Sequence, residues 1–165
     1  MPWKILVVLA FPIVIVSLFV LFYVAKPHSK KATVVLADFV NSTGDTTFDH
    51  SLNRTLEQDL EDPTFPHILS ESEVRGELRL MDEPTAQSIT EQLARKICLH
   101  TGSKAILIGS ISKVSNSYSV HLWAAGCSTP EIVAEAQAQE VAKDGVPEAL
   151  KVAAAQLRVK FLESR

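Results

Sequence analysis

The chain has 165 residues, of which 47% are hydrophobic and 21% are charged, and its mean hydropathy is positive at +0.15. The apolar excess lies near the amino terminus. The part after residue 31 contains all 19 acidic residues and 12 of the 16 basic residues, so its net charge is −7. An acidic domain of this kind excludes nucleic acid and an anionic membrane face as partners, because both bind clustered Lys and Arg side chains.

Residues 5–25 form an apolar run of 21 residues without a charged side chain. At about 1.5 Å per residue, a helix of this length reaches roughly 31 Å, which spans a bilayer core. The run is longer than the apolar region of a cleaved secretory signal, and no Cys directly follows it to accept a lipid. The sequence therefore predicts a flank at 1–4, one transmembrane helix at 5–25 in the lipid bilayer, a linker at 26–32 and a domain at 33–165.

The charges that flank this run leave its orientation open. The amino-terminal amine and Lys4 lie before the run, whereas Lys26, Lys30 and Lys31 lie after it. Positive charge is retained on the cytoplasmic side of a membrane helix, so the count alone favours a cytoplasmic domain by one charge. Features within the domain have to decide the orientation.

The domain begins with a β-branched, mostly apolar run at residues 33–40, which is typical of a strand buried at the centre of a sheet. Residues 41–45 have the composition of a turn. Apolar side chains then recur every four residues, which predicts a helix that is capped by Asp49 and ended by Pro63.

Residues 67–69 are expected to form a second strand, and the Ser and Glu residues that follow open a helix over 70–81. Ser88 and Glu91 have the spacing of a capping box for the next helix, which Gly102 ends in a left-handed conformation.

Three strand-like runs follow at 105–114, 118–125 and 132–141, and short polar turns between them predict an antiparallel meander. Pro147 lies in the first turn of a final helix. The predicted fold is an α/β (α+β) sandwich. Helices pack on a mixed sheet of about five strands, in the order strand, helix, strand, helix, helix, three strands, helix, after the transmembrane helix.

Several short segments occur in the order found in one known family. They are residues 34–39, Asn41, 43–45, 48–49, 68–70, 78–81, 97–98, 102–105, 109–111 and Cys127. This series, over roughly residues 33–163, resembles the TolB-like amino-terminal domain that follows the membrane helix of bacterial Ser/Thr kinases and tetratricopeptide proteins. The resemblance implies an α/β sandwich outside the cytoplasmic membrane that binds or senses and does not catalyse.

Cys98 and Cys127 are the two cysteines of the chain. Cys98 precedes one predicted strand and Cys127 follows the end of its antiparallel partner, so a hairpin brings them together. One interpretation is a disulfide, which contributes roughly 3–4 kcal/mol for a loop of about 30 residues and requires an oxidising compartment. The other is a pair of buried thiols that act as small hydrophobic side chains.

A zinc site made of Cys98, His100, His121 and Cys127 has suitable ligand types. However, His121 and Cys127 are six residues apart along one strand direction, which separates them by about 20 Å. The same distance argues against a nucleophilic pair of Cys and His. The sequence therefore predicts no metal site, no catalytic residue and no cofactor.

The segment after the first strand is a candidate binding loop, because ligands often bind at the carboxyl ends of strands in open α/β sheets. Its polar residues are Asp38, Asn41, Thr43, Asp45 and Asp49. A structural interpretation competes, since Asp45 belongs to a Gly turn and Asp49 to a helix cap. An acidic side chain at Asp38, inside an apolar strand, must find a donor or face solvent.

These observations together predict a non-enzymatic, single-pass membrane protein. Its domain is expected in the periplasm, where it binds a protein or another envelope component. One alternative is a cytoplasm-facing regulatory domain that dimerises through its sheet edge or its last helix. A remote alternative is a hydrolase that uses the Asp38 loop, although the sequence places no His or Lys beside that residue.

Overall fold

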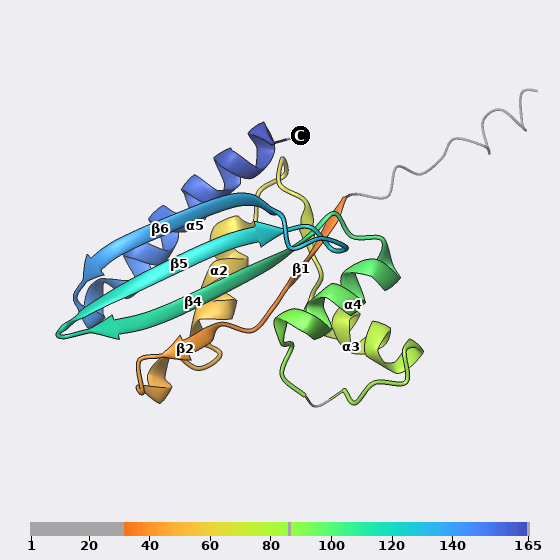
Figure 1. Ribbon diagram of the computed structural model, residues 1–165, viewed down its shortest axis with the longest axis horizontal. Coiled ribbons are helices and arrows are strands. Elements are labelled where there is room, and N and C mark those ends of the chain that lie inside the picture. The colour runs from red at the N-terminus through yellow and green to blue at the C-terminus, as the bar shows by residue number, and fades with distance from the viewer. Residues whose placement is uncertain (1–31, 86, 165) are drawn as a thin grey trace, which may run out of the picture. The chain divides into compact units, whose positions relative to one another are not determined.

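The computed structural model describes residues 32–85 and 87–164, which fold around one mixed sheet (Figure 1). The predicted flank, transmembrane helix and most of the linker lie outside these residues. Within the described ranges, no helix is both long enough and apolar enough to cross a membrane.

The sheet has the strand order β3-β1-β4-β5-β6, and β2 pairs with β4 as a sixth strand. The strands are β1 (Thr33–Leu36), β2 (Val40–Ser42), β3 (His67–Ile68), β4 (Ala105–Val114), β5 (Ser117–Ala125) and β6 (Ile132–Val141). β1 runs parallel to β3 and β4, and β2 runs parallel to β4, whereas β4, β5 and β6 form an antiparallel meander. The predicted mixed sheet and its meander are confirmed.

The run at 33–40, predicted as one strand, divides into β1 and β2. Leu36 pairs with Leu107 and Val40 pairs with Ser110, so three residues of the first run lie opposite two residues of β4. This irregularity turns Asp38 out of the ladder. It also explains why the sheet has six strands and not five.

Helices cover both faces of this sheet (Figure 1). They are α2 (Ser51–Leu60), α3 (Glu71–Leu80), α4 (Glu91–Thr101) and α5 (Val146–Glu163), with short 3-10 turns η1 (Thr46–Phe48) and η2 (Lys143–Gly145). α2 and α5 bury their leucines in one core cluster, and α3 and α4 contribute to a second cluster on the opposite face. The apolar periodicities of the sequence therefore identified the buried helix faces correctly.

Three predicted helix boundaries are confirmed, namely the starts of α3 and α5 and the end of α4. The side chains of Ser70 and Glu73 form a reciprocal capping box at the start of α3. Gly102 ends α4 with φ 68°, and Pro147 lies in the first turn of α5.

The predicted cap of α2 is wrong. The residue before α2 is His50, at φ 60° and without a side-chain cap, and Asp49 instead accepts a hydrogen bond from Asn41. Asp45 caps η1 by accepting from the amide of Thr47 at 3.0 Å. A 3-10 turn precedes α2, and the capping carboxylate, Asp45, lies at the start of that turn and not at the start of α2.

The predicted cap of α4 is also displaced. Thr90, not Ser88, accepts the hydrogen bond from the Leu93 amide. The reason is that Ile89 is held against the end of β1, since the Asp38 amide donates to its carbonyl oxygen at 2.8 Å. Thr90 then has the extended backbone of an N-cap residue, with ψ 162°, and α4 begins after it.

Candidate functional site

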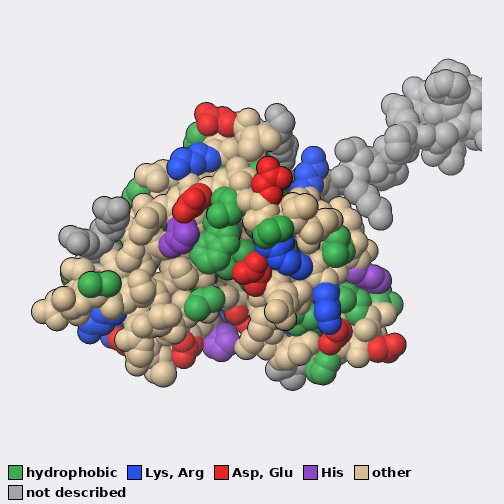
Figure 2. Space-filling view, viewed as in Figure 1, with side chains coloured by type: hydrophobic (Ala, Val, Ile, Leu, Met, Phe, Trp, Pro, Cys, Tyr) green, Lys and Arg blue, Asp and Glu red, His purple; other side chains and the backbone are tan. Residues whose placement is uncertain are grey.

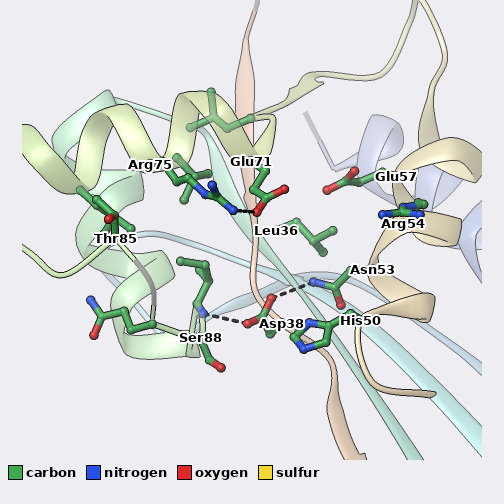
Figure 3. Close-up of a pocket in the computed structure, with 15 residues that line it drawn as sticks. Leu36, Asp38, His50, Asn53, Arg54, Glu57, Glu71, Arg75, Thr85 and Ser88 are labelled. Carbon is green, nitrogen blue, oxygen red and sulfur yellow. Dashed lines mark hydrogen bonds and ion pairs between the residues drawn. The ribbon is translucent and has the colours of Figure 1, made fainter. Parts of the chain in front are cut away.

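A cavity of about 430 Å³ opens at the carboxyl end of β1, between α2 on one face of the sheet and α3 on the other (Figure 3). Apolar side chains and polar side chains both line it. Its lining includes Leu36, Asp38, Asn53, Arg54, Glu57, Glu71, Arg75 and Ile89. This is the position at which open α/β sheets commonly bind ligands.

Asp38 connects three elements at this cavity. Its Oδ1 atom accepts from Asn53 Nδ2 at 3.0 Å, and its Oδ2 atom accepts from the Ile89 amide at 2.9 Å. The carboxylate thus joins the end of β1 to α2 and to the segment before α4 (Figure 3). The donors that an acidic side chain in an apolar strand requires are therefore these two groups.

Asn53 is a residue of the site that the sequence interpretation missed. Its oxygen accepts from the Phe39 amide at 2.9 Å while its nitrogen donates to Asp38. One amide side chain thus holds both sides of the interruption between β1 and β2. No local signal marks Asn53, because it is one of several polar residues in a helix and its partner lies 15 positions away.

Charged side chains surround the mouth of the cavity. Arg75 forms an ion pair with Glu71 one helical turn before it. Burial raises the pKa of Glu57, and the negative charge of Glu71 raises it further, whereas Arg54 opposes both effects. The carboxylates of Glu57 and Glu71 point toward one another in Figure 3. A cationic group placed between them would relieve this repulsion.

The other residues of the predicted binding loop form a separate network. The side-chain nitrogen of Asn41 donates to the Asp45 carbonyl oxygen at 2.9 Å and to Asp49 Oδ1 at 2.7 Å. The Asn41 oxygen accepts from the amide of Thr43, and the Thr43 hydroxyl oxygen accepts from the amide of Asp45. These bonds hold the turn, which Gly44 completes at φ 75°.

The five residues predicted as one binding loop therefore do not converge. Asp38 lies at the cavity, whereas Asn41, Thr43, Asp45 and Asp49 bond mainly with one another. Lys143, from the far end of the chain, forms an ion pair with Asp45 and lowers its pKa. A ligand role for these five residues stays a prediction.

Cys98 and Cys127 are joined by a disulfide, with Cα atoms 5.6 Å apart. That separation lies within the ordinary range for disulfides. Cys98 is completely buried in α4, and Cys127 is half buried just after β5. The bond ties α4 to the meander on the face that α3 and α4 cover.

The two histidines weighed as zinc ligands have other partners. His100 lies 3.3 Å from a carboxylate oxygen of Glu77, and His121 lies 2.7 Å from Glu135. The His121 ring also stacks on Trp123, with centroids 4.8 Å apart. Over the described part of the chain, no three His, Cys, Asp or Glu residues are grouped as metal ligands.

The face shown in Figure 2 carries Lys and Arg side chains that stand apart from one another among acidic, histidine and apolar groups. Nucleic acid and anionic lipid surfaces are recognised by clustered positive charge. This face therefore offers no such cluster.

No family model and no curated protein matches the chain. Solved structures do match its fold. The LpoB C-terminal domain from Salmonella enterica aligns with a TM-score of 0.58 at 16% identity, over 70% of this chain and 86% of that domain.

Two further structures are similar. The LpoB C-terminal domain from Escherichia coli aligns with a TM-score of 0.53 at 14% identity, over 72% of this chain and 88% of that chain. Lipoprotein GNA1162 from Neisseria meningitidis aligns with a TM-score of 0.52 at 9% identity, over 68% of this chain and 83% of that chain. At these identities the likeness is one of fold: the domain has the mixed α/β architecture of the LpoB C-terminal domain and of lipoprotein GNA1162.

Proposed function

We propose that this chain is a single-pass membrane protein whose TolB-like domain at 33–165 lies outside the cytoplasmic membrane. Residues 5–25 anchor it in the bilayer and residues 26–32 link anchor to domain. The domain binds a protein or another envelope component and does not catalyse a reaction.

The bond between Cys98 and Cys127 is the observation that carries the location. Disulfides persist in oxidising compartments and are rare in cytosolic proteins. The Cys98–Cys127 disulfide therefore supports an extracytoplasmic domain. It outweighs the flanking charges, which favour the opposite orientation by a single positive charge. Lipoprotein GNA1162 provides further support, because its name shows that this fold occurs on a lipid-anchored protein.

The cavity beside Asp38 supports a binding function. Both carboxylate oxygens of Asp38 accept hydrogen bonds from Asn53 and Ile89 that hold three elements together. These two bonds support a positioning role for Asp38. The mixed lining of the cavity suits a ligand with both apolar and charged groups.

The test uses the full chain in membranes of its native host. Membranes are washed with alkaline carbonate, and the protein is alkylated without reduction and its mass is measured. We expect the protein to stay in the membrane pellet and to gain two alkyl groups only after reduction. Proteinase K added to intact spheroplasts should degrade the domain.

Two results would contradict the proposal. Release of the protein by carbonate would show that residues 5–25 do not anchor it in the bilayer. Two thiols that alkylate without reduction, together with protection from proteinase K until the spheroplasts are lysed, would place the domain in the cytoplasm and favour the regulatory alternative.

A further inference from the structure

A second cavity, of about 500 Å³, continues the first along α2. Glu57 lines both cavities. We call the combined surface the α2 groove; residues 50–63 bound it on one side and residues 65–75 on the other. Along α2 the groove is roughly 17 Å long at 1.5 Å per residue, which matches about five residues of extended chain.

One wall of the α2 groove is an open strand edge. The His67 amide donates to the Ala32 carbonyl oxygen at 2.9 Å. The Leu69 amide donates to that of Val34 at 3.0 Å. Successive residues of a strand direct their N–H and C=O groups to opposite edges, so the N–H and C=O of Ile68 point away from β1. Because β3 ends the strand order, no strand among the described residues pairs with this side.

The opposite wall carries two carboxylates without a direct ion-pair partner among the described residues. Glu57 lies in the last turn of α2, Glu61 is the residue directly after its end, and both are exposed. Burial raises the pKa of Glu57, and the negative charge of Glu71 across the first cavity raises it further.

The floor of the second cavity is apolar. Its apolar lining residues are Leu60, Pro63, Phe65, Pro66 and Ile68. Lys and Arg side chains bury their aliphatic stems on apolar surface and keep their charged ends near acidic groups. An apolar floor beside two carboxylates therefore fits a basic side chain.

We propose that the α2 groove binds an extended basic segment of a partner protein. The segment adds a strand to the outer edge of β3 through the backbone of Ile68, and it places a Lys or Arg side chain between Glu57 and Glu61. This inference rests on the proposed binding function and names the chemistry of the partner. Strand addition supplies the main-chain bonds and the carboxylates supply the selectivity.

The experiment uses the full chain in nanodiscs of zwitterionic lipid. The probe is a fluorescein-labelled heptapeptide of alternating lysine and valine, read by fluorescence anisotropy, and empty nanodiscs correct for binding to lipid. We expect saturable binding of this probe. We expect none of a matched peptide of alternating glutamate and valine.

Variants locate the contact. Glu57→Gln and Glu61→Gln should each weaken binding by roughly 2- to 5-fold, the range of a partly exposed ion pair. Neither should lower the unfolding temperature, because neither side chain belongs to a described ion pair and each substitution removes a negative charge at the carboxyl end of α2. Glu163→Gln is the matched control, because Glu163 is an exposed acidic residue at the end of α5 and does not line either cavity. This variant should bind the probe like the wild type.

The backbone contact has its own test. Two probes are compared, one with N-methyl groups on the odd residues and one with N-methyl groups on the even residues. Only one of them loses the hydrogen bonds to β3, so that probe should bind at least several-fold more weakly than the other. Equal binding of the acidic peptide, wild-type affinity in both glutamine variants, or indifference to N-methylation in both probes would each overturn the inference. The nanodisc exposes the domain whatever its orientation in the cell, so these results are independent of the spheroplast test.

Discussion

The ring of Phe39 lies directly over Gly109, in the space that a side chain at position 109 would occupy. A Cβ atom built on Gly109 would approach Cζ of Phe39 to 2.3 Å. Phe39 belongs to the interruption between β1 and β2, and Gly109 belongs to β4. The absence of a side chain at Gly109 therefore allows the chain to leave the ladder at Asp38.

Replacing this glycine should destabilise the domain. Gly109→Ala is expected to cost about 1–3 kcal/mol in the free energy of unfolding, the usual range for overpacking a core. Urea denaturation measures it, and Phe39→Leu in the same chain should recover part of the loss. Gly76→Ala is the control, because nothing lies within 4 Å of a Cβ there and the change inside α3 should stabilise slightly. Equal stability of Gly109→Ala and wild type would show that the Phe39 ring does not occupy the space of a side chain at position 109.

Asp38→Asn should lower stability by about 1–3 kcal/mol, because one carboxamide cannot accept from both Asn53 and Ile89. Its nitrogen would face one of these donors. Hydrogen exchange at the Ile89 amide should become faster, and urea denaturation gives the free energy. Asp82→Asn serves as the control, since this exposed residue at φ 56° accommodates Asn and should change stability by less than about 0.5 kcal/mol. Unchanged exchange at Ile89 would show that Asp38 does not hold that segment.

Removing the disulfide should cost about 3–4 kcal/mol by the chain-entropy argument for a separation of 29 residues. The double variant Cys98→Ala and Cys127→Ala is compared with the wild type by urea denaturation, with and without a reductant. Reductant should destabilise the wild type and leave the double variant unaffected. A wild type indifferent to reductant would argue that the bond does not form in the purified protein.

The ion pair of Lys143 with Asp45 predicts an acid-dependent loss of stability. The hydrogen bond from Lys143, followed by those from Thr47, holds the pKa of Asp45 below its ordinary value of 3.8. A depressed acidic pKa stabilises the folded state above that ordinary value, and the benefit disappears as the pH falls below it. Lys143→Gln should therefore lose less stability on acidification than wild type. Lys113→Gln, which removes another exposed lysine, is the control. It should lose as much stability on acidification as the wild type does, and urea denaturation across this pH range measures the difference.

The meander and the last helix could be predicted from sequence because their signals are local. Apolar alternation, polar turns and Pro147 define them over a few residues. The capping box of Ser70 and Glu73 and the left-handed Gly102 are equally local. The interruption at Asp38 could not be predicted in this way, since it depends on a glycine 71 positions away and on Asn53.

The site was predictable only in its position. The sequence directed attention to the end of the first strand, and Asp38 does lie at a cavity there. It did not separate Asp38 from Asn41, Thr43, Asp45 and Asp49, which bond among themselves. The sequence also did not predict the acidic wall of the α2 groove. Glu57 and Glu61 look like ordinary solvent-exposed residues until the position of β3 opposite them is known.

β1 is the first described strand, and it runs parallel to both of its neighbours, β3 and β4. A pull on the chain ahead of Ala32 is therefore directed along β1, while its hydrogen bonds to both neighbours lie across the pull. Such bonds share the load and must break together, whereas a hairpin strand pulled from its free end opens one bond at a time. With the proposed anchor ahead of it, a domain of this geometry would resist tension between a membrane and a bound partner.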